Sequence, residues 1–162
     1  MDQIRGGAMV NNKNIINQYV NDYCKLRDRQ NAVYSNYAKK FNLTTIELFV
    51  LDILWFEENE CTQKMICERL SMNKQTISSI VNKFIKLGYF SFEEVETDKR
   101  NKKIVFTKKG YEYTKQIIPP AAEAENIAMG NLILSQIEKL VKLTALFTEN
   151  MEKEFKVIKE VK

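Results

Sequence analysis

A polar and basic face between residues 74 and 87 is the feature of the sequence with the clearest chemical meaning. If this segment is a helix, each residue advances 100°, and one side is apolar, with Ile77, Ile80, Val81 and Phe84. The other side carries seven candidate contact residues: Lys74, Gln75, Thr76, Ser78, Ser79, Asn82 and Lys83. Gln and Asn pair with adenine edges, Ser and Thr adapt to several bases, and Lys reaches guanine or phosphate. The spacing predicts a helix that enters the major groove of double-stranded DNA.

The alternative interpretation of this face is an ordinary solvated helix surface. Such surfaces usually mix acids with lysines, as the segment 136–159 does with Glu138, Glu149, Glu152 and Glu154. No acid occurs between Lys74 and Lys86. The lack of acids favours contact with a polyanion.

A basic segment follows, because residues 99–109 contain six basic side chains and no acid. Strand-like runs at 89–96 and 103–107 predict a hairpin whose polar tip covers 97–102. Its candidate DNA contacts are Asp98, Lys99, Arg100 and Lys102. An arginine at such a tip suits a narrow minor groove, where the negative potential is concentrated. Asp98 would hold the guanidinium of Arg100; the alternative is a plain Asx turn.

Several elements must position these residues. Thr44 and Glu47 form a capping-box pattern, Thr62 and Asn73 are N-cap candidates, and Gly88 is a typical helix stop. The expected helices before the hairpin cover residues 13–40, 45–58, 63–70 and 74–87.

The chain after the hairpin is also expected to be helical. Thr107 can cap a helix that starts near Lys108, and Pro119-Pro120 should kink or break it. A second capping box, which begins at Ser135, opens a last helix over 136–159, whose apolar stripe runs from Ile137 to Ile158. Residues 1–12 are expected to be a disordered leader.

Charge is concentrated in the middle of the 162-residue chain, which has a net charge of +4. Residues 62–110 carry 11 basic and 5 acidic side chains, a net charge of +6, whereas 1–61 and 111–162 each carry −1. A local positive field attracts polyanions. The chain has no histidine, no phosphate-binding glycine loop and no Gly-x-Ser-x-Gly motif. We therefore expect no enzyme, no cofactor and no metal.

The cysteines and the hydropathy predict a cytoplasmic protein. An odd number of cysteines, Cys24, Cys61 and Cys67, favours reduced thiols. The N-terminus lacks the apolar core of a signal peptide. No run of eighteen apolar residues occurs, so no contact with a membrane is expected.

The wing signature of the MarR family of transcriptional regulators resembles Asp98-x-Arg100-x-x-x-Ile104-x-Phe106-Thr107-x-x-Gly110 in this chain. The segment 70–89, LSMNKQTISSIVNKFIKLGY, is similar to the turn and recognition helix of the same family. The similarity is most specific over 62–110, and the layout of the elements matches over nearly the whole chain.

The resemblance implies a mainly α fold with a small β-hairpin wing: a winged helix-turn-helix flanked by N- and C-terminal dimerisation helices. We therefore assign 13–44 to the N-terminal dimerisation helix, 45–110 to the DNA-binding domain and 111–162 to the C-terminal dimerisation helices. It also implies a homodimeric repressor on a pseudo-palindromic operator, with the 74–83 face in the major groove, Arg100 in the minor groove, and release by a small-molecule effector. The effector-binding residues are not identified.

Two other functions are weighed against this one. A winged helix can serve protein or RNA contact without specific duplex binding, but its wing should then be less basic and its recognition face more apolar. One branch of the family senses oxidants through a cysteine in the first helix, where Cys24 lies. The alternative is that Cys24 only packs against apolar side chains, as a single cysteine on an apolar helix stripe usually does.

Overall fold

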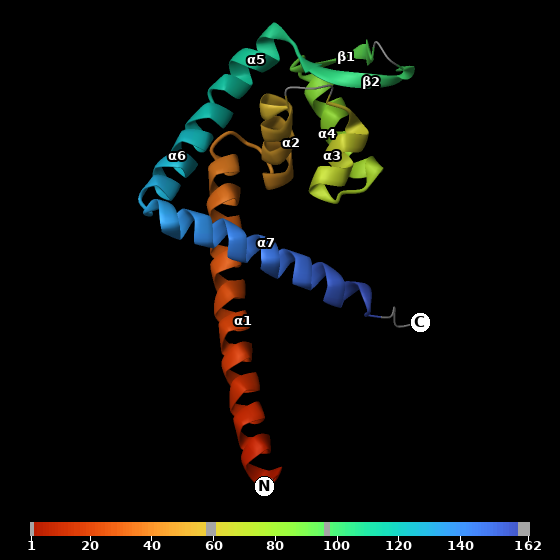
Figure 1. Cartoon of the computed structure of the whole chain (residues 1–162). Coiled ribbons are helices and arrows are strands. Elements are labelled where there is room, and N and C mark those ends of the chain that lie inside the picture. Colours follow the sequence, from red (N-terminus) through yellow and green to blue (C-terminus); the bar gives the residue numbers. More distant parts are fainter. Residues whose placement is uncertain (1, 58–60, 96–97, 159–162) are drawn as a thin grey trace. The chain divides into compact units, whose positions relative to one another are not determined.

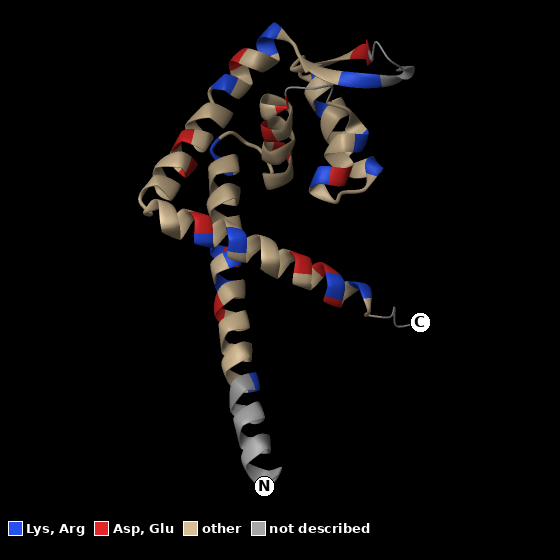
Figure 2. Cartoon of the chain, viewed as in Figure 1, with Lys and Arg blue, Asp and Glu red and all other residues tan. Residues whose placement is uncertain are grey.

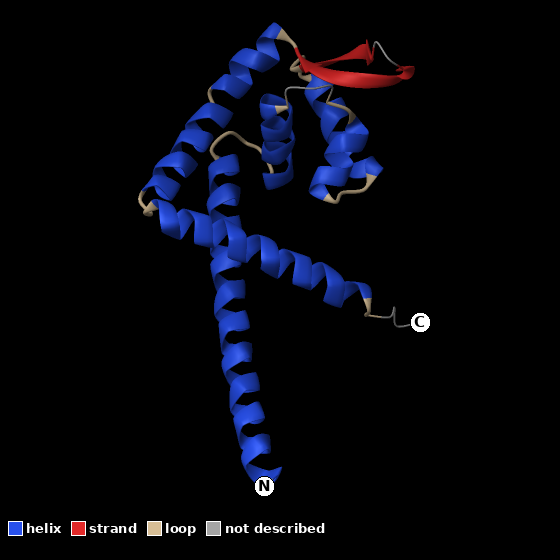
Figure 3. Cartoon of the chain, in the orientation of Figure 1, coloured by secondary structure: helices blue, strands red, loops and turns tan. Residues whose placement is uncertain are grey.

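The computed structural model describes the backbone of residues 2–57, 61–95 and 98–158 and the side chains of 13–57, 61–94 and 102–158. These residues are mostly helical, with a two-stranded antiparallel hairpin, as Figure 3 shows. The mainly α fold with a small hairpin is therefore confirmed. The chain consists of two compact units, of which one ends at Thr114 and the other begins at Lys115.

The first helix of the chain, α1 (Asp2–Lys39), is longer than expected from the sequence (Figure 1). Residues 2–12, expected as a disordered leader, belong to the helix. No proline interrupts them, so the backbone hydrogen bonds of the helix can continue through this segment. The helix is followed by a turn that ends at Asn42, which has a φ of 56°. Asparagine is among the residues that tolerate this left-handed conformation.

The core of the first unit is built around α2 (Thr45–Phe56). The expected capping box is present: the side chain of Thr44 accepts from the backbone N–H of Glu47, and the carboxylate of Glu47 accepts from the N–H of Thr44. Both bonds satisfy donors that would otherwise be unpaired at the helix start. The buried apolar side chains of α2 are Leu48, Val50, Leu51, Ile53 and Leu54.

Two short helices, α3 (Gln63–Leu70) and α4 (Lys74–Lys86), follow. The N-cap predictions are confirmed, since Thr62 accepts from Met65 N–H at 3.3 Å and Asn73 accepts from Thr76 N–H at 2.8 Å. Ser71, with a φ of 50°, turns the chain between the helices. The pair thus forms a helix-turn-helix.

A hairpin of β1 (Phe90–Val95) and β2 (Asp98–Phe106) comes next, after Gly88 stops α4 with a φ of +73°. The register pairs Phe90 with Phe106, and it shifts between Glu94 and Val95. The expected tip at 97–102 is wrong, because β2 already begins at Asp98. The irregularity takes up the unequal strand lengths, so the polar residues from Asp98 onward belong to the backbone of β2.

The hairpin is tied to α5 (Lys108–Lys115) through Thr107 and Gly110. The hydroxyl of Thr107 donates to the carbonyl oxygen of Gly88 at 2.7 Å and accepts from Gly110 N–H at 3.0 Å. The predicted cap is thus confirmed. A Cβ at position 110 would overlap the backbone of Tyr89, so only glycine fits this approach of α5 to the start of the hairpin.

The second unit contains α6 (Ile118–Gly130) and α7 (Leu134–Lys156). The prolines break the helical run as predicted: α5 ends at Lys115, and Pro119-Pro120 lie in the first turn of α6, where a missing N–H costs nothing. The predicted capping box at Ser135 is wrong. Instead, α7 begins at Leu134, and the side chain of Gln136 accepts from the N–H of Ile133 at 3.1 Å. Gln136 can reach that donor because it lies in the first turn.

Candidate nucleic-acid interface

The orientation of α4 is set by its apolar stripe. Ile77, Val81 and Phe84 are fully buried, and the ring of Phe84 lies 4.9 Å from the ring of Phe90, between centroids. The predicted stripe is confirmed, although Ile80 is only half-buried. Because one side of the helix is buried in this way, the opposite side is presented to solvent.

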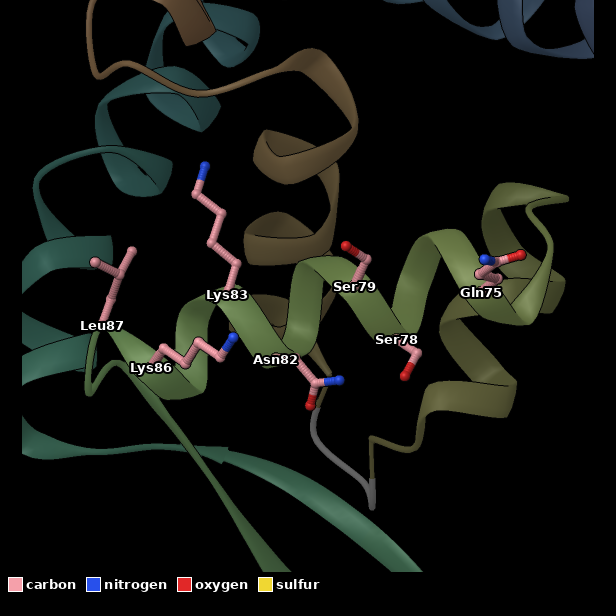
Figure 4. A pocket seen from close by; sticks show the side chains of 7 residues that line it. All are labelled: Gln75, Ser78, Ser79, Asn82, Lys83, Lys86 and Leu87. Carbon is pink, nitrogen blue, oxygen red and sulfur yellow. The ribbon is translucent and has the colours of Figure 1, made fainter.

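A groove of ≈ 680 Å³ runs along the exposed side of α4 (Figure 4). Ser79 and Lys83 lie along one edge of the helix in this view, and Ser78 and Asn82 lie along the other. The residues that line it are Gln75, Ser78, Ser79, Asn82, Lys83, Lys86 and Leu87. The groove brings together five of the seven residues predicted from the sequence, with hydrogen-bond donors and acceptors on both edges.

Lys74 and Thr76, the other two predicted residues, lie in the first turn of α4. Lys74 is exposed. Thr76 is half-buried, and its hydroxyl donates to the side chain of Asn73 at 3.0 Å. Part of its hydrogen-bonding capacity is therefore used to cap the helix.

The three lysines of α4 differ in their electrostatic partners. Lys83 donates to the carboxylate of Glu47 on α2, with 2.6 Å between Nζ and Oε1. Within the described part of the chain, Lys74 and Lys86 have no ion-pair partner. Figure 2 shows basic residues on α3, on α4 and along β2. Their positive charge is available to a polyanion except where an acid neutralises it.

The carboxylate of Glu47 is the acid that neutralises Lys83. Its side chain is only 7% exposed. Burial by itself would raise its pKa, but the hydrogen bonds from Lys83 and from the N–H of Thr44, with the positive charge of Lys83, outweigh burial and lower the pKa. Glu47 therefore remains ionised at neutral pH.

Sequence reasoning identified Glu47 only as a capping residue and missed its bond to Lys83. The two residues are 36 positions apart, so no local pattern connects them. The available signal was an acid, one of two with Asp52, inside a mostly apolar helix. A buried acid requires a partner, but which lysine provides it depends on tertiary packing.

We call the hairpin of β1 and β2 the wing. The structure describes only part of its side chains, those of residues 90–94 and 102–106. Lys102 is exposed, and it pairs with Glu94 in the strand register. Lys103 forms an ion pair with Glu93 at 3.5 Å. Asp98, Lys99 and Arg100 lie in β2, but their side chains are outside the described residues. The bracket of Asp98 and Arg100 therefore stays a prediction.

The base of the wing is fastened to the segment that precedes α3. The N–H of Ile104 donates to the carbonyl oxygen of Cys61 at 2.7 Å, and Thr62 forms an isolated bridge with Lys103. These bonds connect β2 to the N-cap of α3. The helix-turn-helix and the wing are thus held on one scaffold.

Cys61 is buried, and burial, with a smaller contribution from Glu57, raises the pKa of its thiol to about 11. A thiol with so high a pKa is unreactive at neutral pH. Cys24 is a half-buried free cysteine on α1. In the described ranges, no three metal-binding side chains gather, and no helix has the length and hydropathy needed to cross a membrane.

A helix-turn-helix that exposes a polar second helix and is followed at once by a hairpin defines a winged helix-turn-helix protein. A sequence model of the MarR family matches residues 41–101. The chain is also 31% identical over 130 residues to the HTH-type transcriptional regulator MgrA of Staphylococcus aureus, over 76% of this chain and 85% of that protein. The chain therefore belongs to the MarR family. It is a DNA-binding transcriptional regulator and not an enzyme.

Solved structures share the fold at low sequence identity. AbsC, a MarR family regulator from Streptomyces coelicolor, superposes with a TM-score of 0.70 at 16% identity, over 85% of this chain and 94% of that one. The S. aureus MepR–DNA complex superposes with a TM-score of 0.64 at 19% identity, over 78% of this chain and 97% of that one. The winged helix-turn-helix layout is thus found in distant relatives.

The part-buried bond between Glu47 and Lys83 generates a prediction about stability. We expect Glu47→Gln to lower the free energy of unfolding at neutral pH by about 1.5–3 kcal/mol, the usual contribution of a charged hydrogen bond. Because folding lowers the pKa of Glu47, this contribution is complete above its ordinary value of 4.5 and is lost as the pH falls through the folded value. The difference between wild type and variant should therefore shrink at low pH.

Urea unfolding curves at neutral pH and at about pH 3 measure this difference. The control is Glu125→Gln, which removes an exposed carboxyl from α6 and should have little effect at either pH. A wild-type advantage over Glu47→Gln that is the same at both pH values would contradict the assignment.

Proposed function

We propose that the chain acts as a homodimeric repressor that binds a pseudo-palindromic operator. The observation that carries the proposal is the groove of α4, whose lining is polar and basic while the opposite side of the helix is buried. A helix with this division can enter a major groove without uncovering the core. The two-fold symmetry of a dimer would then match the symmetry of its DNA site.

Base recognition is assigned to the polar residues of α4. Gln75 and Asn82 have amides that can form paired hydrogen bonds with adenine, and Ser78 and Ser79 can bond to several bases. Lys74 and Thr76 are assigned to the phosphates and bases near the start of the helix, where the helix dipole also attracts phosphate.

Minor-groove contact is assigned to the wing. Arg100 would insert into a narrow groove, Asp98 would orient its guanidinium, and Lys99 and Lys102 would contact phosphates. The exposure of Lys102 supports this part of the proposal. So do the backbone bonds between β2 and the segment before α3, because they hold the base of the wing beside the helix-turn-helix.

Dimerisation is assigned to α1 and α7, because both expose large apolar side chains. On α1 these include Ile16 and Tyr19, which are 57% and 71% exposed, and on α7 they include Leu140 and Val141. No residue of α7 is buried among the described residues. A second copy of the chain is the proposed partner for these stripes, since extended apolar surfaces of this kind are rare on monomers.

Repression and release by a small effector complete the proposal, and both come from membership of the family. A dimer on an operator would block access of the transcription machinery. No residue is assigned to an effector. Removing the protein should raise transcription beside its operator, and unchanged transcription would contradict repression.

The assignment of α4 to the major groove predicts separate effects on specificity and stability. Gln75→Ala, Ser79→Ala and Asn82→Ala should each lose about 1–3 kcal/mol of discrimination between operator and altered operators. All three residues are exposed, so the free energy of unfolding should change by less than about 0.5 kcal/mol. Competition binding assays and urea unfolding measure the two quantities. Asn126→Ala on α6 is the control.

The opposite result would be variants that unfold more easily while their folded fraction discriminates between operators as well as the wild type does. It would show that these side chains do not contact bases.

The assignment of the wing predicts distinct salt effects. Lys99→Ala and Lys102→Ala should each reduce the steepness of log affinity against log salt by up to about 0.9, for all sequences alike. Arg100→Ala should also reduce the preference for A·T-rich flanks, and Arg100→Lys should restore it only in part. Asp98→Ala should weaken binding even though it removes a negative charge.

Salt titrations of operator binding test these four positions, with Lys115→Ala on α5 as a control. Tighter binding by Asp98→Ala would disprove the bracket and leave the wing as a general electrostatic contact.

The assignment of the dimer interface predicts that Leu140→Lys with Met151→Lys produces a monomer, because charge on the apolar stripe of α7 opposes association. Specific DNA binding should be lost with the dimer. Sedimentation measures the mass, and Glu149→Lys on the same helix is the control. A variant that still sediments as a dimer would exclude α7 as the main interface.

A further inference from the structure

The ion pair of Glu47 and Lys83 connects the core helix α2 with the DNA-facing helix α4. The Nζ of Lys83 lies 2.6 Å from Oε1 of Glu47. The second carboxylate oxygen, Oε2, accepts from the N–H of Thr44 at 2.8 Å. The carboxylate is therefore held from two sides, by its own helix start and by a lysine that lines the groove of α4.

Burial at this pair is unequal. The side chain of Glu47 is 7% exposed, whereas that of Lys83 is 47% exposed. If Lys83 moved to a phosphate, the ammonium would exchange one partner for another. The carboxylate would keep its bond from the N–H of Thr44 but would be left buried without a counter-charge. Leaving a buried charge without a partner costs more than a solvent-exposed ion pair contributes. Retention of the pair is therefore favoured when DNA binds.

The other two lysines of α4 provide the comparison. Lys74 and Lys86 are exposed and, in the ranges that the structure describes, have no acid partner. Each can neutralise a phosphate and release a counterion. The charge of Lys83 is already balanced within the protein.

We propose that Lys83 stays bound to Glu47 in the DNA complex, as a positioning residue that fixes α4 against α2 and contributes no charge to phosphate binding. This inference rests on the proposed insertion of α4 into DNA, and it replaces for Lys83 the direct contact expected from the sequence. Glu47 acts through Lys83 and touches no DNA.

The test is the slope of log affinity against log salt for duplex operator DNA. Lys86→Gln should flatten the slope by up to about 0.9, the contribution of one phosphate contact. Glu47→Gln with Lys83→Gln removes both charges, and its slope should equal that of the wild type. Glu47→Gln alone releases the ammonium of Lys83 toward the DNA and should steepen the slope by up to about 0.9.

A double variant with a slope flattened as much as that of Lys86→Gln would overturn the inference, because Lys83 would then be a phosphate contact. A purely structural pair would weaken binding in Glu47→Gln without steepening the slope, and this outcome also overturns it. Glu47→Gln with Lys83→Met provides a second neutral pair if the first folds poorly, as judged by unfolding curves. Failure of the wild type to bind any duplex would instead refute the proposed function itself.

Discussion

Burial of one side of α4 is the constraint on which the rest of the structure depends. Ile77, Val81 and Phe84 are completely buried, and each such side chain contributes about 1.5–3 kcal/mol relative to exposure. A rotation of the helix about its axis would expose them and bury hydrogen-bonding groups without partners, which is costly. The polar face is thus presented to solvent because the apolar face has only one favourable position.

The same core also determines where the wing begins. Phe84 packs against Phe90, and Phe90 packs against Phe106, so the aromatic contacts run from α4 into both strands. Thr107 then bonds to Gly88 and to Gly110. Helix, hairpin and α5 meet at one junction, where a glycine at 110 is required by the nearby backbone of Tyr89. The groove of α4 and the base of the wing therefore belong to one packed arrangement.

The basic residues fall into two groups: those that form ion pairs within the protein, and those whose charge remains available to bind DNA. Lys83 and Lys103 are paired with Glu47 and Glu93, so the net charge of +6 over residues 62–110 does not describe each lysine alone. The pair of Lys103 stabilises little because its acid, Glu93, is 57% exposed. The pair of Lys83 differs because its acid is buried, so the burial of the partner acid distinguishes the two lysines.

Local patterns alone determined much of this protein. The caps at Thr44, Thr62 and Asn73, the stop at Gly88 and the apolar stripe of α4 were all predictable, because hydrogen bonds to helix ends and the 3.6-residue period involve residues close in sequence. The resemblance of 70–89 and of the wing signature to the MarR family led to the correct family, because these motifs also consist of residues close together in the sequence.

Only the tertiary structure decided the features that join distant residues. The start of β2 at Asp98 depends on its pairing with β1, because a polar run reads as a loop until a partner strand supplies its hydrogen bonds. The bond of Lys83 to Glu47 joins positions 36 residues apart. From the sequence alone, Lys83 was predicted to contact DNA like the other basic residues of the exposed face. Burial of the carboxylate distinguishes it, and burial is a property of the packed core rather than of any segment.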